Sequence, residues 1–381
     1  MGITISLCMI VKNEEHNLGI CLESVKDIVD EIIIVDTGSA DKTVEIAKEY
    51  TDKIYHFEWI NDFAAARTFS FSKGTKDYLM WLDADDVVEE DSRKRLLELK
   101  ETLDPDVDIV TMHYRHGLQP DGSFSILLTR ERLMKRSRNF VWKNKVHETI
   151  DLNPEENNYK VVESDIYITH RHKVDMLKSL SRNLQIIEEL VGTEHYGPQE
   201  ACYHGLTLQS VGKIDESLEV LNKYFEMIRK SDLAPRINAY LNVYEIYMNR
   251  GDFQAAYQLL EDNETYLKDK SEYYTTLGDF AKDILSDYES AIFYYEKAIK
   301  CEGNDFLGMP SNIRMEEYYY FKPYYALGHC YLKLGRYEDS VKAFKKASKY
   351  DEPKELTKIL EKTKRIAELI GFSDDDEDQE A

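Results

Sequence analysis

Short apolar runs separated by helical patterns fill about the first 170 residues, and they constrain the fold more than any other feature. Residues 3–11, 31–36 and 78–82 are almost continuously apolar, without the alternation that a half-exposed strand shows. Strands of this kind, joined by helices, are typical of a parallel sheet covered on both faces. We therefore predict an α/β domain with a Rossmann-like, mostly parallel sheet. Runs at 108–114 and 125–135 predict a mixed edge to this sheet.

Strand patterns end near residue 175, and helical periodicity continues from there. Helix-pair signatures begin at Gly212, Gly251, Ser286 and Gly335, at spacings of 39, 35 and 49 residues. The last unit fits the tetratricopeptide (TPR) pattern of small and aromatic positions best, through Leu327, Gly328, Tyr331, Gly335, Tyr337, Phe344 and Ala347. Because the spacings depart from the roughly 34 residues of the ideal repeat, we predict an irregular, all-α array of TPR-like repeats.

These patterns divide the chain into three parts. We predict an α/β domain over 1–175, a TPR-like helical-repeat domain over 176–365 and an acidic, disordered tail over 366–381. A repeat array presents a concave surface suited to a peptide or an extended partner. The alternative is that the repeats only support the first domain or form a homodimer, and the sequence leaves both open.

The net charge and the cysteines limit the partners and the cellular compartment that we expect for this protein. With 49 basic and 72 acidic residues, the formal net charge is −23, which repels the phosphates of nucleic acid and of anionic membranes. No apolar run approaches the ~20 residues that cross a bilayer, so we expect no membrane span. The five cysteines are scattered without a CxxC pair, and the N-terminus resembles a first strand more than a signal peptide. We therefore expect a cytoplasmic protein with reduced thiols.

Acidic residues follow two of the predicted strands. Asp83-Ala-Asp85 follows the run at 78–82, and ligands of open α/β sheets bind at the carboxyl ends of strands. Two carboxylates there suit Mg²⁺ or Mn²⁺ and, through the cation, a diphosphate. The alternative is that Asp85 or Asp86 caps a helix over 87–99. Asp36 ends another strand; it either accepts hydrogen bonds from a ribose or base edge, or caps the turn that follows.

Asp62 and Arg67 belong to a third element. Asp62 is expected to cap a helix over 63–72, and Arg67 follows about one and a half turns later. Arg67 either reaches a phosphate oxygen of a bound cofactor or pairs with Asp62 or Glu58. We count Asp62 and Arg67, with Asp36 and Asp83, as candidate cofactor-binding residues.

The candidate bases and the third metal ligand come later in the chain. A transfer that inverts a sugar's anomeric carbon needs one base for the acceptor's proton, and Glu148 is the best-placed candidate, with His147 as the alternative. His170 and His172 close the region, and one of them is a candidate metal ligand beside Asp85, since imidazole often joins carboxylates on divalent ions.

Taken in order, these elements resemble the family 2 glycosyltransferases of the GT-A fold. The matching segments are 6–14, 34–43, 61–67, 81–86 and 145–148. Within the family, the chain resembles the bacterial subgroup with a C-terminal TPR region, which includes the sublancin-type peptide S-glycosyltransferases. The first domain alone also resembles enzymes that extend lipopolysaccharide cores.

The resemblance implies an inverting, metal-dependent transfer from a nucleotide sugar, expected to be a UDP-sugar. It implies that Asp36 holds the nucleoside, Asp83 the donor's ribose or sugar, and Asp85 the metal. It further implies that Glu148 is the base and that His170, in competition with His172, contacts the metal or the diphosphate.

The sequence does not identify the acceptor of the sugar. We expect a Ser, Thr or Cys side chain of a peptide or protein that the repeats recruit. Three alternatives are a glycan or lipopolysaccharide-type acceptor with structural repeats, a TPR adaptor with an inactive transferase domain, and a nucleotidyltransferase. The segment 145–148 and the absence of a Gly/Arg/Lys-rich phosphate loop disfavour the last. The sugar depends on pocket shape and on loops such as 114–125.

Overall fold

The computed structural model describes residues 2–118, 124–152, 159–171, 176–230, 236–301, 316–350 and 353–371. The chain forms two compact units, one running to Tyr224 and the other beginning at Phe225. The first unit includes helices α5 (Met176–Glu188) and α6 (Pro198–Ser210), so it extends beyond the domain boundary predicted at residue 175. Within the described ranges, no helix combines the length and the hydropathy needed to cross a bilayer.

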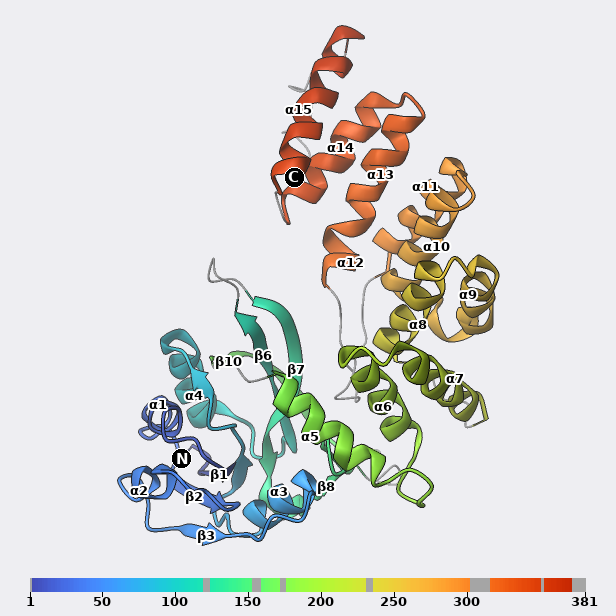
Figure 1. The fold of residues 1–381 in the computed structure, drawn as a ribbon. Helices are drawn as coiled ribbons and strands as arrows, with labels where there is room; N and C mark the ends of the chain where they lie inside the picture. The colour runs from blue at the N-terminus through green and yellow to red at the C-terminus, as the bar shows by residue number, and fades with distance from the viewer. Residues whose placement is uncertain are drawn as a thin grey trace. The chain divides into compact units, whose positions relative to one another are not determined.

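A mostly parallel sheet organises the first unit, as the sequence predicted (Figure 1). Strands β3, β2, β1, β4, β6 and β10 run in one direction, and β7 and β5 run in the other. The order across the sheet is β3-β2-β1-β4-β7-β6-β10-β5. The strands are β1 (Ile5–Val11), β2 (Glu31–Asp36), β3 (Ile54–His56), β4 (Tyr78–Met80), β5 (Asp86–Val88), β6 (Ile109–Leu118), β7 (Phe124–Lys135) and β10 (Val161–His170). The antiparallel β7 lies inside the sheet and not at the predicted mixed edge, because β4 and β6 pair with its two sides.

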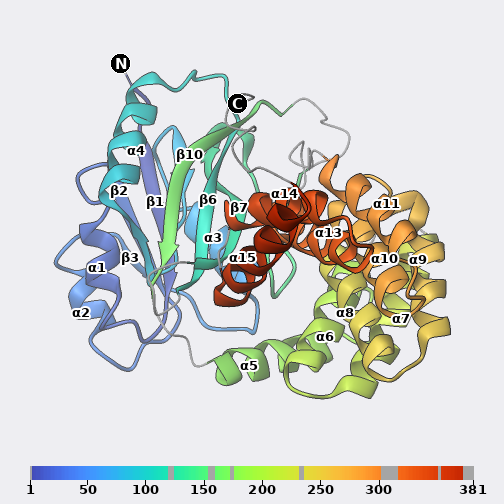
Figure 2. The same ribbon diagram turned by 90° about the horizontal axis from the view of Figure 1, so that it is seen from above.

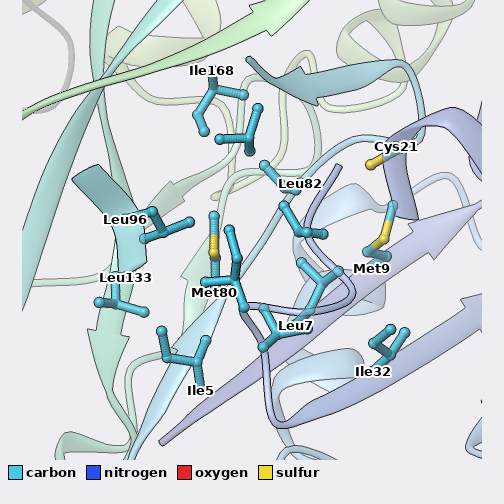
Figure 3. Packing of buried hydrophobic residues seen from close by; sticks show 14 of the residues in the cluster. Ile5, Leu7, Met9, Cys21, Ile32, Met80, Leu82, Leu96, Leu133 and Ile168 are labelled. Carbon is cyan, nitrogen blue, oxygen red and sulfur yellow. The ribbon is translucent and has the colours of Figure 1, made fainter. Parts of the chain in front are cut away.

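Both faces of the sheet are covered, which explains why β2 is buried at every position. Helices α1 (Leu18–Glu23), α2 (Thr43–Ala47) and α4 (Glu90–Thr102) pack on one face, with α4 alongside β10 (Figure 2). Alternate residues of β1 meet Cys21 of α1 and Leu96 of α4 in this layer (Figure 3). Helix α3 (Phe63–Phe71) and the ribbon of β8 (Trp142–Lys143) and β9 (Thr149–Ile150) pack on the other face. A 3-10 turn, η1 (Arg136–Arg138), follows β7.

The region after Asp85 differs from the predicted helix over 87–99. Residues Asp86–Val88 form strand β5, because they pair with β10, and α4 begins only at Glu90. The residue before α4 is Glu89, which makes no side-chain capping bond. Neither Asp85 nor Asp86 is therefore a helix cap, which corrects the structural alternative for these two acids.

Antiparallel helix pairs make up the rest of the described chain, and the predicted repeat pattern is confirmed. The four predicted signature residues Gly212, Gly251, Ser286 and Gly335 each adopt a positive φ, between 54° and 83°, in the turn between paired helices. Beyond α6 the helices are α7 (Ile214–Lys230), α8 (Ile237–Asn249), α9 (Phe253–Leu267), α10 (Ser271–Asp283), α11 (Tyr288–Ile299), α12 (Glu316–Tyr320), α13 (Lys322–Lys333), α14 (Tyr337–Ser348) and α15 (Lys354–Leu369). Helix α15 passes the predicted start of the tail at 366, because Ala367 is buried in the repeat core. The rest of that tail, from 372, lies outside the described residues.

Candidate active site

A pairing between β5 and β10 creates the first cluster of the site. After β4 the chain passes Asp83 and Asp85, turns, and returns as β5 antiparallel to β10, with Asp86 opposite His170. This register brings Asp85, Asp86 and His170 together, with one ligand atom from each residue lying within 4.8 Å of the other two. The structure therefore gathers the two predicted metal residues, Asp85 and His170, and adds Asp86. His172, the competing histidine, lies outside the described residues.

His170 lies in an unusual electrostatic environment. Its Nδ1 lies 3.5 Å from Asp85 Oδ1, 3.8 Å from Asp86 Oδ1 and 3.1 Å from the Tyr114 hydroxyl. Burial alone would lower the pKa of His170, but the two carboxylates outweigh it and raise the pKa to about 10. The imidazole of His116 stacks on this ring at 4.7 Å, and burial together with His170 lowers the pKa of His116. In the absence of a cation, the positive charge of protonated His170 compensates the negative charges of Asp85 and Asp86.

The cluster fits a divalent cation. Asp86 Oδ1 and His170 Nε2 are buried and have no hydrogen-bond partner in the described structure, a costly state for polar atoms. Two carboxylates and an imidazole are ligand types that divalent metal sites use. A cation held by the two carboxylates and by His170 Nδ1, the ring nitrogen that faces them, would satisfy Asp86 Oδ1 and replace the positive charge of the protonated ring.

Asp86 is held from behind by a buried arginine. Arg132 Nη1 donates to Asp86 Oδ2 at 3.0 Å, and both side chains are fully buried. The backbone N–H of Asp83 donates to the same oxygen at 3.0 Å. The guanidinium of Arg132 also lies over the ring of Trp81, 3.8 Å from its centroid. Asp86 and Arg132 are site residues that the sequence prediction missed. The only signal for Asp86 was its place beside the predicted acids.

A second arginine joins two further acids of the site. Arg67 Nη2 donates to Asp83 Oδ1 at 2.7 Å, and Nε donates to Glu148 Oε1 at 2.6 Å. These two acids, and neither Asp62 nor Glu58, are the described partners of Arg67. Burial works against ionisation of Asp83, but Arg67 and then Arg132 outweigh it and hold the pKa of Asp83 below its usual range. The structure thus connects the predicted donor residue to the predicted base.

His147 and Glu148 are neighbours in sequence but have different surroundings. The His147 ring stacks on Tyr203 of α6, with the centroids 3.8 Å apart, and its carbonyl accepts from Gln199 Nε2 at 3.1 Å. His147 has a φ of 55°, in the left-handed region that few non-glycine residues adopt. Of the two base candidates, Glu148 is the one in described contact with the Arg67–Asp83 pair.

Asp36 and Asp62 both make local capping bonds. Asp36, at the end of β2, accepts from the backbone N–H groups of Gly38 and Ser39, each at 3.1 Å, and Gly38 has a φ of 100° that favours glycine. Asp62 Oδ1 accepts from Ala65 N at 2.8 Å and caps α3 as predicted. A role for either acid in holding a nucleotide remains a prediction.

Comparison with known proteins gives two domain matches. Residues 6–153 match the profile of glycosyl transferase family 2, and residues 271–305 and 321–353 match tetratricopeptide repeats. The first match contains every predicted site residue except His170. The second covers the helix pairs α10–α11 and α13–α14.

Individual proteins are also similar to parts of this chain. The prophage-derived glycosyltransferase SunS of Bacillus subtilis is 25% identical over 66% of this chain and 60% of its own. A TPR repeat-containing protein of Synechococcus elongatus is 50% identical over 22% of this chain and 20% of its own. This chain thus spans less than two thirds of either relative. Glucosyl-3-phosphoglycerate synthase from Mycobacterium tuberculosis, solved with Mn²⁺ and UDP-glucose, overlaps 50% of this chain and 78% of its own at a TM-score of 0.36 and 16% identity. By its family matches, this chain carries an N-terminal domain of glycosyl transferase family 2 followed by tetratricopeptide repeats.

Proposed function

We propose that this protein is an inverting, metal-dependent glycosyltransferase that moves a sugar from a nucleoside-diphosphate sugar, expected to be a UDP-sugar, to a side chain of a peptide or protein. The observation that carries the proposal is the pair of clusters after β4: the ligand set Asp85–Asp86–His170, and the acids Asp83 and Glu148 joined by Arg67. All of these residues except His170 lie within the match to glycosyl transferase family 2. Similarity to the glycosyltransferase SunS supports the transfer of a sugar.

The donor side of the reaction uses the strand ends. Asp85, Asp86 and His170 would hold Mg²⁺ or Mn²⁺, which supplies positive charge for the departing diphosphate. Asp36, at the end of the parallel strand β2, accepts hydrogen bonds from the nucleoside, and Asp83 accepts them from the ribose or sugar. Both acids follow strands of the same sheet at its carboxyl edge, where ligands of open α/β sheets bind.

Glu148 performs the proton transfer. Arg67 occupies Glu148 Oε1, which leaves Oε2 to accept the proton of the attacking hydroxyl or thiol. The acceptor's oxygen or sulfur forms a bond to the anomeric carbon, and the bond from that carbon to the diphosphate oxygen breaks. The diphosphate leaves with the bonding electrons, and the sugar inverts its configuration.

The acceptor is the least constrained part of the proposal. The tetratricopeptide repeats support a peptide or protein, because stacked repeats present an extended binding surface. The motif resemblance to sublancin-type peptide S-glycosyltransferases supports the same class. A cysteine acceptor would demand less of Glu148 than a serine or threonine, because a thiol loses its proton more readily than a hydroxyl.

Release of nucleoside diphosphate from a nucleotide sugar tests the donor side of the proposed reaction. The purified chain is incubated with a panel of UDP- and GDP-sugars, with Mn²⁺, with Mg²⁺ and with EDTA. We expect release from at least one donor only with a cation, and loss of release in Asp85→Asn. Asp91→Asn is the matched control, since its side chain is 89% exposed on α4. Absence of both release and cation-dependent donor binding would refute the enzyme and favour an adaptor.

The acceptor half needs a second assay with the donor so identified. Peptides that contain Cys, Ser or Thr are compared with oligosaccharides of the lipopolysaccharide-core type, and mass spectrometry detects the added sugar. Modification of peptides alone is the expected result. Modification of the saccharides alone would replace the peptide acceptor with a glycan and leave the repeats with a structural role.

A further inference from the structure

We propose that Arg67 is a positioning residue that fixes the base Glu148 and joins it to the donor-side acid Asp83. The inference rests on the proposed function and assigns a role to a residue for which the sequence suggested only a phosphate contact or a local ion pair. It follows from the burial of Arg67, from the division of its hydrogen bonds and from the charges it joins.

Burial restricts the movement of Arg67. The residue is 5% exposed and lies on α3, between the sheet and the ribbon β8–β9. Its guanidinium carbon is 4.4 Å from the ring centroid of Trp81 and 5.3 Å from that of Trp142. The two rings meet edge to face, 5.3 Å apart. A cation enclosed in this way keeps one orientation and cannot swing out to follow a ligand in solution.

The hydrogen bonds of Arg67 are divided between two acids. Its Nε binds one oxygen of Glu148, and Nη2 binds one oxygen of Asp83. Because the guanidinium is planar, these bonds fix the directions of both carboxylates relative to one another, which the point charge of a lysine does not do. The third nitrogen, Nη1, is buried and has no hydrogen-bond partner in the described structure. The described hydrogen bonds of the guanidinium therefore go to the two acids alone.

The positive charge of Arg67 also allows Glu148 and Asp83 to stay ionised close to one another. Glu148 and Asp83 lie on the same guanidinium, at 2.6 and 2.7 Å. Without that cation, the Glu148 carboxylate, which is 13% exposed, and the Asp83 carboxylate, which is 37% exposed, would lose the positive charge they share, and each would favour a different orientation or a bound proton. A base that has turned away by about 1 Å loses on the order of 10²-fold in rate. Arg67 thus acts on the reaction through the position of Glu148.

A double-mutant cycle tests this role. Nucleoside-diphosphate release with Mn²⁺ is measured for wild type, Arg67→Met, Glu148→Gln and the double variant, using the donor that the panel identifies. We expect Arg67→Met to lower kcat by about 100-fold in the wild-type background and by less than about threefold beside Glu148→Gln, because residues that act as a unit are not additive. Arg67→Lys should restore part of kcat. Arg95→Met, which removes a half-exposed arginine of α4, is the control and should leave kcat unchanged.

Three results would overturn the inference. Equal losses of kcat in both backgrounds would show that Arg67 acts independently of Glu148, as a phosphate contact would. A change confined to KM would assign Arg67 to donor binding in the ground state. If Arg67→Met does not fold, a folded Arg67→Lys with wild-type kcat and KM would refute the role. If the wild type itself releases no nucleoside diphosphate, the proposed function fails first, which separates the two failures.

Discussion

The buried ion pair behind the metal cluster leads to a strong prediction about stability. Arg132→Met removes a fully buried guanidinium and keeps most of the volume of the side chain. The variant leaves the carboxylate of Asp86 without its 3.0 Å partner, in a place where its exposure is 0%. It also removes the donor to the Trp81 carbonyl at 3.2 Å. The expected result is a large loss of stability in the first unit.

The magnitude follows from the surroundings of Asp86. Breaking a buried pair by removing one partner typically costs about 3–5 kcal/mol, because an uncompensated charge remains. A protonated His170 would still lie 3.8 Å from Asp86 Oδ1, and the Asp83 N–H would still donate to Oδ2. These contacts place the expected loss near the lower limit, at about 3 kcal/mol.

Tryptophan fluorescence during urea unfolding measures this loss selectively. All three tryptophans, Trp59, Trp81 and Trp142, lie in the first unit, so the signal follows that unit in a chain whose two units need not unfold together. EDTA is present throughout, so that no metal cation binds near Asp86 and compensates for the lost positive charge of Arg132. Arg95→Met, whose ion pair with Asp165 is 46% and 66% exposed, is the control and should cost no more than about 1 kcal/mol.

A second variant makes the test decisive. Arg132→Met combined with Asp86→Asn removes both charges, so it should recover at least half of the lost stability. A loss below about 1 kcal/mol for Arg132→Met, or a double variant no more stable than the single one, would refute the argument that an unpaired Asp86 is the cause.

Three further predictions concern other parts of the chain. Gly328→Ala should destabilise the repeats by about 1–3 kcal/mol, since its Cβ would lie closer than 3.0 Å to the ring of Phe344. Thermal unfolding followed by circular dichroism measures this loss, with the exposed Lys333→Ala as the control. Equal melting temperatures of the two variants would contradict the prediction. Burial alone would raise the pKa of Glu31, but hydrogen bonds from Lys53, Ser6 and Thr75 outweigh it and lower the pKa from 4.5 to about 2. This carboxylate therefore contributes up to about 3 kcal/mol above pH 4.5, which is lost as the pH falls towards 2. Glu31→Gln should thus be less stable than wild type at pH 7, and the gap should shrink as the pH falls towards 2. A gap in urea titrations at pH 2.5 as wide as the gap at pH 7 would reject this account. His170→Ala should weaken Mn²⁺ binding by more than about tenfold in calorimetry, and an unchanged affinity would remove His170 from the metal site.

Local sequence determined the architecture of both units. A fully apolar β2 requires cover on both faces, because an exposed face would leave apolar side chains in water. The prediction of a mostly parallel sheet followed from that run and its neighbours. Likewise, Gly212, Gly251 and Gly335 marked the turns of helix pairs, because glycine adopts the left-handed backbone of these turns without strain. Asp62 was recognised as a cap for the same kind of local reason.

The tertiary structure decided which of the acids act together. The alternative for the acids placed 87–99 in a helix capped by Asp85 or Asp86, yet pairing with β10 makes Asp86–Val88 a strand and sets Asp86 opposite His170. The sequence left Arg67 open between a phosphate contact and an ion pair with Asp62 or Glu58, but its partner Glu148 lies 81 positions away. The sequence placed Asp83 and Asp85 at one edge of the sheet because they follow a predicted strand. Their partners were fixed by strand register and by packing around Trp81, which depend on contacts between distant segments that no local pattern encodes.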